Sequence, residues 1–284
     1  MFNSSMFQSI KAALSKDEDK GAAAGLYNEI LKTPAGNTFT VRILPFAKDP
    51  SKTFFHYFVQ GWTSFATGQY VQAISPQTFN ERDPISEERF RVLRTGSSEE
   101  KEKMQAVRRS EKWLLNVYVV EDPTNPANNG TVKILRYGKQ LHKIIMEGIE
   151  GEDAEEFGAR IFDLGANGVN FKIKVEQQGD YPTYVSSRFT GAGKLNLTED
   201  EQQKIYNSTF NLEEVFSVKS YDELKQMIDE HIYVNTEVKP TQVATSHFET
   251  KSTIVSQPET STFREQASNT VSMEDDIDEL LKDL

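Results

Sequence analysis

The sequence predicts a mainly β protein with α-helical insertions, built as a small, partly open barrel. Short runs of alternating or β-branched residues recur before residue 180, and a charged helical stretch separates the third run from the fourth. Five or six short strands with a helix inserted among them are typical of such a barrel. We therefore expect an α+β fold in which the sheet forms the core.

Six runs are predicted as strands from their period-2 alternation or their β-branched and aromatic content. In the first run, Phe39, Val41 and Ile43 fall on one face. The fourth run is apolar on both faces and is expected to be buried. The predicted strands are residues 38–44, 53–59, 69–74, 113–120, 131–137 and 169–175.

Helices are predicted between and after these strands. Thr198 and Glu201 form a capping-box pattern, which marks the start of one of them. The predicted helices are residues 86–112, with an interruption at 95–98, then 139–146, 198–207 and 220–230.

The composition predicts an intracellular protein, and part of the chain is expected to lie outside the hydrophobic core. Of its 284 residues 37% are hydrophobic, and the mean hydropathy is −0.57. No run approaches the roughly 18 apolar residues of a membrane span, and Met1 to Ser5 lack the features of a secretion signal. The chain has no cysteine, which excludes disulfides, thiol catalysis and cysteine-ligated zinc.

Changes of composition divide the chain into an arm, a core, a linker and a tip. Residues 1–36 are predicted as an N-terminal arm that could self-associate, and 37–238 as the core, with 60–112 as an inserted subdomain. Residues 239–273 are rich in Ser, Thr, Gln and Glu and are predicted as a disordered linker. In the acidic tip, 274–284, four apolar residues recur at helical spacing, which predicts a segment that folds against a partner. The predicted partner-binding residues are Asp275, Asp276, Ile277, Asp278, Glu279, Leu280, Leu281 and Leu284.

A basic island lies inside an acidic chain. The net charge is −11 overall, but residues 103–143 hold eight Lys or Arg against three Asp or Glu. Such an island is a local anion site that the total charge conceals. No catalytic set, metal-binding spacing or cofactor motif accompanies it: 191–194 lacks the spacing of a phosphate loop, and 122–130 lacks that of a calcium loop. We expect neither enzymatic activity nor a cofactor.

Basic and aromatic residues alternate along and beside the predicted strands. Single-stranded nucleic acid requires cations for its phosphates and flat rings for its unstacked bases. Rings on strands are usually core residues, whereas Tyr181 and Tyr184 lie in a polar turn, which favours their exposure. The candidate residues are Arg108, Arg109, Lys112, Trp113, Arg136, Tyr137, Lys139, Tyr181, Tyr184 and Arg188.

Several ordered segments resemble one family. They are 41–45, the run from Trp113 to Pro123 with Pro126 and Gly130, then 136–139, 170–189 and the acidic tip. Together they are similar to the single-stranded-DNA-binding proteins of T-even-type tailed bacteriophages. The resemblance implies an OB-fold core, a cooperative N-terminal arm, a cytoplasmic location in the infected bacterium, and a tail that recruits replication and recombination proteins and competes for the DNA groove.

The sequence departs from the family pattern in three respects. The family's zinc is held by one histidine and three cysteines, whereas the matching positions here are Gln60, Ser75, Asp83 and Ser86. The basic motif of the family's arm is missing, and its tyrosine–tryptophan step is reduced to Trp113-Leu114. We therefore expect a zinc-free, sequence-independent single-stranded-DNA-binding protein of phage replication, recombination and repair. An interaction scaffold and an RNA-binding OB protein stay open as alternatives.

Overall fold

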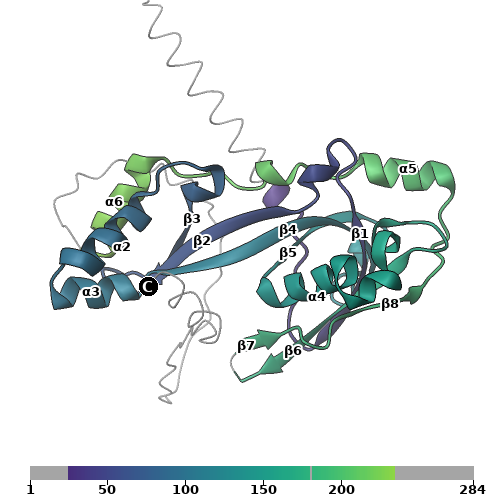
Figure 1. Cartoon of the computed structure of the whole chain (residues 1–284), viewed down its shortest axis with the longest axis horizontal. Coiled ribbons are helices and arrows are strands. Elements are labelled where there is room, and N and C mark those ends of the chain that lie inside the picture. Colours follow the sequence, from purple (N-terminus) through teal and green to yellow (C-terminus); the bar gives the residue numbers. More distant parts are fainter. Residues whose placement is uncertain (1–24, 180, 234–284) are drawn as a thin grey trace, which may run out of the picture.

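The computed structural model describes residues 25–179 and 181–233 (Figure 1). The predicted linker 239–273, the acidic tip and most of the N-terminal arm lie outside these residues. Within the described part of the arm, the backbone at Glu29 and Leu31 hydrogen-bonds to Ile134 on the edge of the sheet, and Leu31 is buried in the core. This part of the arm therefore packs on the core.

The predicted α+β fold class is confirmed: within the described residues there is one antiparallel sheet of eight strands, with helices at its ends. Two of these strands, β7 and β8, were not predicted, because they are short and contain Pro182 and Gly191. The strands are β1 Asn37–Leu44, β2 Phe55–Thr63, β3 Tyr70–Ile74, β4 Arg108–Glu121, β5 Val132–Tyr137, β6 Val169–Gln178, β7 Tyr181–Thr183 and β8 Arg188–Ala192.

Five strands form the barrel part of the sheet, in the order β5–β4–β1–β6–β8. β1 lies in the middle, where Val41 pairs with Val119 of β4 and with Phe171 of β6. The helix α4 (Lys139–Glu150) connects β5 to β6 and packs Leu141 and Ile145 into the core that these strands enclose. A five-stranded, partly open barrel is the architecture of the OB fold.

The chain between β1 and β4 packs with α6 around a second hydrophobic core, and we keep the name inserted subdomain for this group. The first half of β4 extends beyond the barrel and pairs with β2, which pairs in turn with β3. The helices α2 (Pro84–Thr95), α3 (Ser98–Gln105) and α6 (Tyr221–His231) gather at the far end of this ribbon (Figure 1). Their apolar residues surround the buried Trp62.

The start of β4 corrects one prediction. Residues 108–112 were expected at the end of a helix, because they are charged, but they are strand. Their backbone pairs with residues 57–61 of β2, so partners some 50 residues away decide their conformation.

Side-chain caps mark the starts of α2, α3, α5 (Glu199–Asn207) and α6, whereas α4 begins after Gly138 without one. Capping boxes begin α3 at Ser97, α6 at Ser220 and α5 at Thr198, where the box was predicted. The short 3-10 helices are η1 Pro50–Lys52, η2 Pro76–Phe79, η3 Pro126–Asn128, η4 Glu152–Glu155, η5 Gly158–Phe162 and η6 Leu212–Glu214. None of the helices within 25–179 and 181–233 combines the length and the apolar character needed to cross a bilayer.

Candidate nucleic-acid interface

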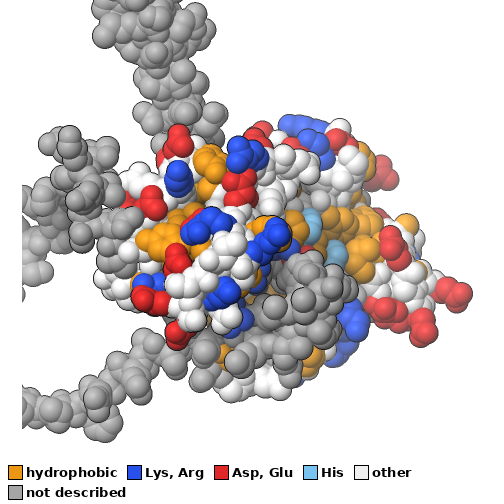
Figure 2. Space-filling model, turned by 60° about the vertical axis from the view of Figure 1, so that its left-hand side comes forward, with side chains coloured by type: hydrophobic (Ala, Val, Ile, Leu, Met, Phe, Trp, Pro, Cys, Tyr) orange, Lys and Arg blue, Asp and Glu red, His pale blue; other side chains and the backbone are white. Residues whose placement is uncertain are grey.

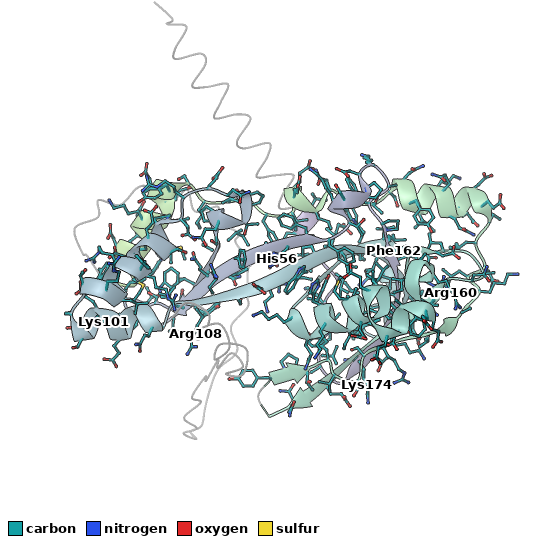
Figure 3. The ribbon with its side chains drawn as sticks, in the orientation of Figure 1. His56, Lys101, Arg108, Arg160, Phe162 and Lys174 are labelled. Atoms are coloured by element: carbon teal, nitrogen blue, oxygen red, sulfur yellow. The ribbon has the colours of Figure 1, made fainter. Side chains whose placement is uncertain are left out.

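The β2–β4 ribbon carries its side chains on two opposite faces. Residues that pair directly across antiparallel strands share a face, so His56 lies beside Trp113 and Phe58 beside Glu111. Arg109 is on this same face, because it is two residues from Glu111. Figure 3 shows His56 on the ribbon between the helical subdomain and the barrel.

A row of stacked groups follows this face, and we name it the ring ladder. It consists of Arg109, Phe58, His56, Trp113 and His142. The Arg109 guanidinium lies 4.8 Å from the centre of the Phe58 ring, and the Phe58 ring meets His56 edge-on at 4.7 Å. His56 stacks on one face of Trp113 at 4.8 Å, and His142 of α4 stacks on the other at 4.1 Å. The ladder thus joins the ribbon to the barrel.

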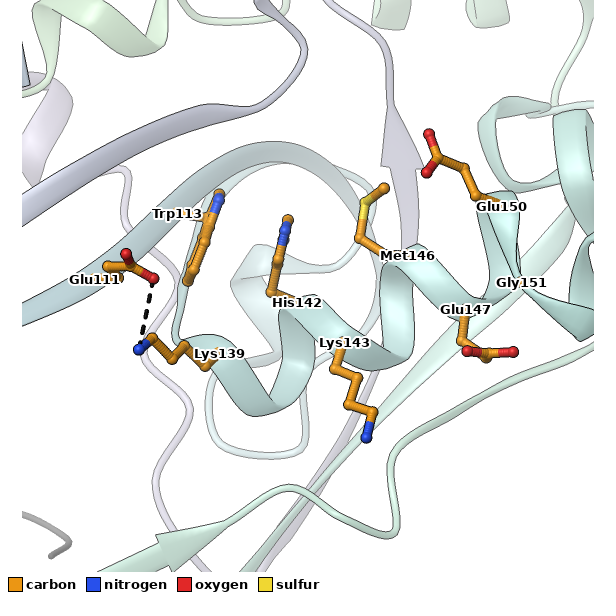
Figure 4. Close-up of a pocket in the computed structure, with 9 residues that line it drawn as sticks. All are labelled: Glu111, Trp113, Lys139, His142, Lys143, Met146, Glu147, Glu150 and Gly151. Atoms are coloured by element: carbon orange, nitrogen blue, oxygen red, sulfur yellow. Dashed lines mark ion pairs between the residues drawn. The ribbon is translucent and has the colours of Figure 1, made fainter. Parts of the chain in front are cut away.

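Cations and carboxylates both lie at the barrel end of the ladder. An open pocket there is lined by Trp113 and His142, by Lys139 and Lys143, and by the carboxylates of Glu111, Glu147 and Glu150, with Glu111 in an ion pair with Lys139 at 3.7 Å (Figure 4). The Lys112 ammonium belongs to the opposite face of the ribbon. The Lys112 side chain nevertheless extends past the end of β5 to Gly138. Its Nζ atom would lie 3.4 Å from a Cβ added to that glycine. Figure 2 shows histidine surface set among apolar, Lys and Arg side chains on this side of the molecule.

His142 is held in its neutral form by its surroundings. Burial lowers the pKa of His142 below its usual value, and the nearby His56 lowers it further, while Glu111 acts in the opposite direction. Its Nδ1 atom is buried and has no hydrogen-bond partner in the described part of the chain. The lowered pKa therefore favours the neutral form of the His142 ring.

The segment with the two candidate tyrosines is attached to α4 beside Lys139. The Gln140 side chain donates to Thr183 Oγ1 at 3.2 Å and accepts the backbone N–H of Tyr184 at 2.6 Å. Tyr181 and Tyr184 are both partly exposed. The β6–β7 hairpin thus brings the backbone at Tyr184 to the start of α4, on the barrel side of the ladder, with Tyr181 three residues earlier on β7.

Two predicted stacking faces are corrected by the structure. Tyr137 is only 4% exposed, and burial raises its pKa far above the usual value, so its ring is a core ring. Trp113 is 8% exposed, and a histidine covers each of its two faces. A base could stack on neither ring without displacing its neighbours. The exposed ring at this position is His56.

Three predicted cations do not join the ladder. Arg136 pairs with Leu114 on the opposite face, where its side chain hydrogen-bonds to the Tyr57 hydroxyl. Arg108 pairs with Gly61 on that same opposite face. Arg188 lies opposite Lys172, on the outer face of β6 and β8. The structure therefore places Arg109 and Lys139 beside the ladder, brings Lys112 from the opposite face to Gly138 at the start of α4, and places the other three elsewhere.

Sequence reasoning missed the rings of His56, Phe58 and His142. His56 and Phe58 stand two residues apart, so a shared strand face was readable from the sequence. Their stacking against Trp113 depends on the register of β2 against β4 and on the position of α4, which no local pattern reveals.

The structure combines a partly open barrel with stacked rings and cations at one end of it. This combination is typical of the class of OB-type barrels whose surface suits an oligonucleotide. The family model described as "gp32 DNA binding protein like" matches residues 36–232. The chain belongs to this family, and the predicted resemblance to T-even-type phage proteins is confirmed.

Two curated relatives have the same degree of similarity. Both are described as "Single-stranded DNA-binding protein", one from Enterobacteria phage T4 and one from Enterobacteria phage T2. Each is 30% identical over 125 residues, which are 42% of this chain and 41% of the relative. The matched stretch therefore spans about two-fifths of the length of these relatives.

Proposed function

We propose that this chain binds single-stranded DNA without sequence preference, along the ring ladder and the cations around it, and that it has no catalytic role. The observation that supports this most is the ladder itself, because it places the exposed ring of His56 between the Arg109 guanidinium and the lysines at the start of α4, and a single strand requires both kinds of group. The family and the two relatives support the same proposal.

Each group has a defined role in this proposal. Arg109, Lys112 and Lys139 contact phosphates, and His56 offers an exposed ring to a base. Trp113 supports His56 from behind rather than meeting the base itself. Tyr181 and Tyr184 extend the row of rings across the start of α4, where Gln140 holds their segment.

The sharpest test is a fluorescence titration with oligo(dT) on a Trp62→Phe variant. The chain has two tryptophans, and Trp62 lies in the separate core of the inserted subdomain, so this variant reports on Trp113 alone. We expect quenching on binding, because a base placed on His56 changes the surroundings of Trp113. An unchanged signal together with no measurable affinity would favour the alternative, an interaction scaffold.

The salt dependence of binding identifies the phosphate contacts. For single strands, each neutralised phosphate contributes about 0.7 to the slope of log K against log salt. We expect Arg109→Ala and Lys139→Ala each to reduce the slope by about that amount. Lys204→Ala is the matched control, because Lys204 is an exposed cation on α5, at the far end of the barrel (Figure 1). Equal effects of all three variants would refute the assignment.

Our proposal for the biological role depends on the resemblance to the phage family and on the acidic tip of the chain. We propose that the protein covers single-stranded DNA during phage replication, recombination and repair in the host cytoplasm. The tip 274–284 recruits phage replication proteins and competes with DNA for the groove, and the N-terminal arm supports self-association. Competition between matched DNA and RNA oligomers tests the RNA-binding alternative, which predicts tighter binding of the RNA.

A further inference from the structure

Three buried polar side chains and the partly buried Ser86 join the strands of the inserted subdomain to its first helix. Ser75 donates to Asp83 Oδ2 at 2.5 Å, and Ser86 donates to the same oxygen at 3.1 Å. Gln60 Nε2 donates to Ser86 Oγ at 2.8 Å. The other Asp83 oxygen accepts the backbone N–H groups of Ile85 and Ser86, which caps α2. We name this group the Asp83 cluster.

The Asp83 cluster occupies the four positions that correspond to the family's zinc ligands, yet its chemistry does not suit zinc. Zinc sites use thiolates, imidazoles and carboxylates, whereas these positions supply two hydroxyls, one amide and one carboxylate. The hydroxyls of Ser75 and Ser86 both donate to the Asp83 carboxylate, which therefore has hydrogen-bond partners without a metal. Among the described residues, moreover, no three His, Cys, Asp or Glu side chains are grouped to hold an ion.

The cluster is connected to the outer end of the ring ladder through one short turn. Ser75 immediately precedes η2, and its backbone N–H donates to the Phe58 carbonyl at 2.9 Å. Thr78 in this turn accepts the backbone N–H of Phe58 at 3.0 Å. Gln77 in the same turn accepts from the Arg109 guanidinium at 3.1 Å. The turn anchored by Ser75 therefore holds both Phe58 and Arg109.

We propose that the Asp83 cluster replaces a metal centre as the device that positions the Arg109–Phe58 end of the ladder, so that both the inserted subdomain and DNA binding are independent of zinc. Asp83 is thus a positioning residue, which acts on DNA through the turn at 76–79. The part of this inference that concerns DNA rests on the proposed function.

The first experiment tests metal independence without reference to DNA. The full-length protein is dialysed against EDTA, its zinc content is measured, and thermal unfolding is recorded before and after dialysis and with added zinc. We expect no stoichiometric zinc and an unchanged unfolding midpoint in all three states. Zinc bound at one equivalent, or a midpoint that falls with EDTA, would overturn the inference.

The second experiment separates positioning from stability. Asp83→Ala removes the acceptor of both serines, and we expect about tenfold weaker binding of oligo(dT), with a salt slope reduced by about 0.7 as the Arg109 contact is lost. Thr198→Ala removes a comparable helix cap on α5 and is the control, with affinity expected within about twofold of wild type. If Asp83→Ala and Thr198→Ala weaken binding equally, Asp83 has no positioning role.

Ser75→Ala provides a variant that keeps the α2 cap intact, in case Asp83→Ala does not fold. It removes only the side-chain bond between the turn and Asp83, and we expect severalfold weaker DNA binding with the same loss of salt slope. Wild-type affinity in a folded Ser75→Ala protein would refute the connection to the ladder. If the wild-type protein itself does not bind DNA, the proposed function fails, while the EDTA experiment still decides whether the cluster replaces zinc.

Discussion

Trp113 supports the proposed DNA-binding surface although its own side chain is buried. His56 and His142 cover its two faces, and only 8% of it reaches solvent. Stacked rings polarise and support each other, each aromatic pair contributing about 0.5–1.5 kcal/mol beyond its burial. Trp113 therefore fixes the ring of His56, which is the surface that a base meets.

The role of His56 is testable by truncation. We expect His56→Ala to weaken oligo(dT) binding by about 1–3 kcal/mol, the usual contribution of one stacked base, and to lower the free energy of unfolding by about 0.5–1.5 kcal/mol through the lost stacking on Trp113. Fluorescence anisotropy measures the affinity. Phe90→Ala is the control, since Phe90 is 63% exposed on α2, outside the ladder. A larger loss in the control than in His56→Ala would contradict the assignment.

The stability of the protein should depend on pH through His142. Its pKa is lower in the folded chain than the ordinary value of 6.5, so the unfolded chain binds this proton more tightly. The stabilisation is therefore complete above pH 6.5 and is lost as the pH falls through the folded pKa. We expect the unfolding free energy from urea titrations to drop from pH 7.5 to pH 5.5, and to drop less in His142→Gln. Parallel pH dependence in both proteins would exclude His142 as the cause.

At the scale of the elements, α4 is the helix that links the barrel core to the ladder. One side of it packs Leu141 and Ile145 into the core, and another carries Lys139 and His142 to the pocket. The close approach of α4 to β8 depends on Gly148, because a Cβ there would lie 2.6 Å from the Phe189 ring.

Gly148→Ala should accordingly destabilise the barrel. We expect a loss of about 1–3 kcal/mol in unfolding free energy, the usual cost of overpacking a core, measured by urea denaturation. Gly191→Ala on β8 is the matched control, because no atom lies within 4 Å of its added Cβ. A stable Gly148→Ala protein would show that α4 can shift away from β8 without cost.

β1 is held to the loops of the barrel by a buried arginine. Arg42 is fully buried, and its guanidinium donates to Asn170 Oδ1 at 2.6 Å and to the Asp163 carbonyl at 2.7 Å. It also donates to the Gly193 carbonyl. Because the Arg42 guanidinium donates to three segments of the chain, it pairs carbonyl oxygens that burial would otherwise leave without a hydrogen bond.

At the scale of the whole molecule, charge is distributed unevenly. The chain carries −11, yet eight Lys or Arg lie within residues 103–143, which run from α3 through β4 and β5 into α4. Residues 239–284 hold nine acidic and four basic residues. The two regions are complementary in charge, which is the physical basis of the proposed competition between tail and DNA.

Removal of residues 240–284 tests this competition. We expect the truncated protein to bind oligo(dT) more tightly than the full chain at low salt and equally at high salt, because screening weakens an intramolecular electrostatic competitor. Binding isotherms at two salt concentrations measure the effect. Unchanged or weaker affinity at low salt would mean that the tail does not compete for the groove.

The sequence by itself determined the fold class, six of the eight strands in the part of the chain that the structure describes, the helix start at Thr198 and the location of the basic island. Each depends on neighbours along the chain: alternation of side chains, caps and local composition. These patterns could be read without knowing any distant contact. The two short strands, whose residues are turn-like, and the strand conformation of 108–112 could not.

Only the tertiary structure decided which rings and cations face the same way. His56 meets Trp113 because β2 pairs with β4 in one register, and His142 meets the other face because α4 packs on the barrel. A shift of one residue would send these side chains to the opposite face. Burial of Tyr137 and the separation of Arg136 and Arg188 from the ladder have the same cause, since contacts between distant segments determine them.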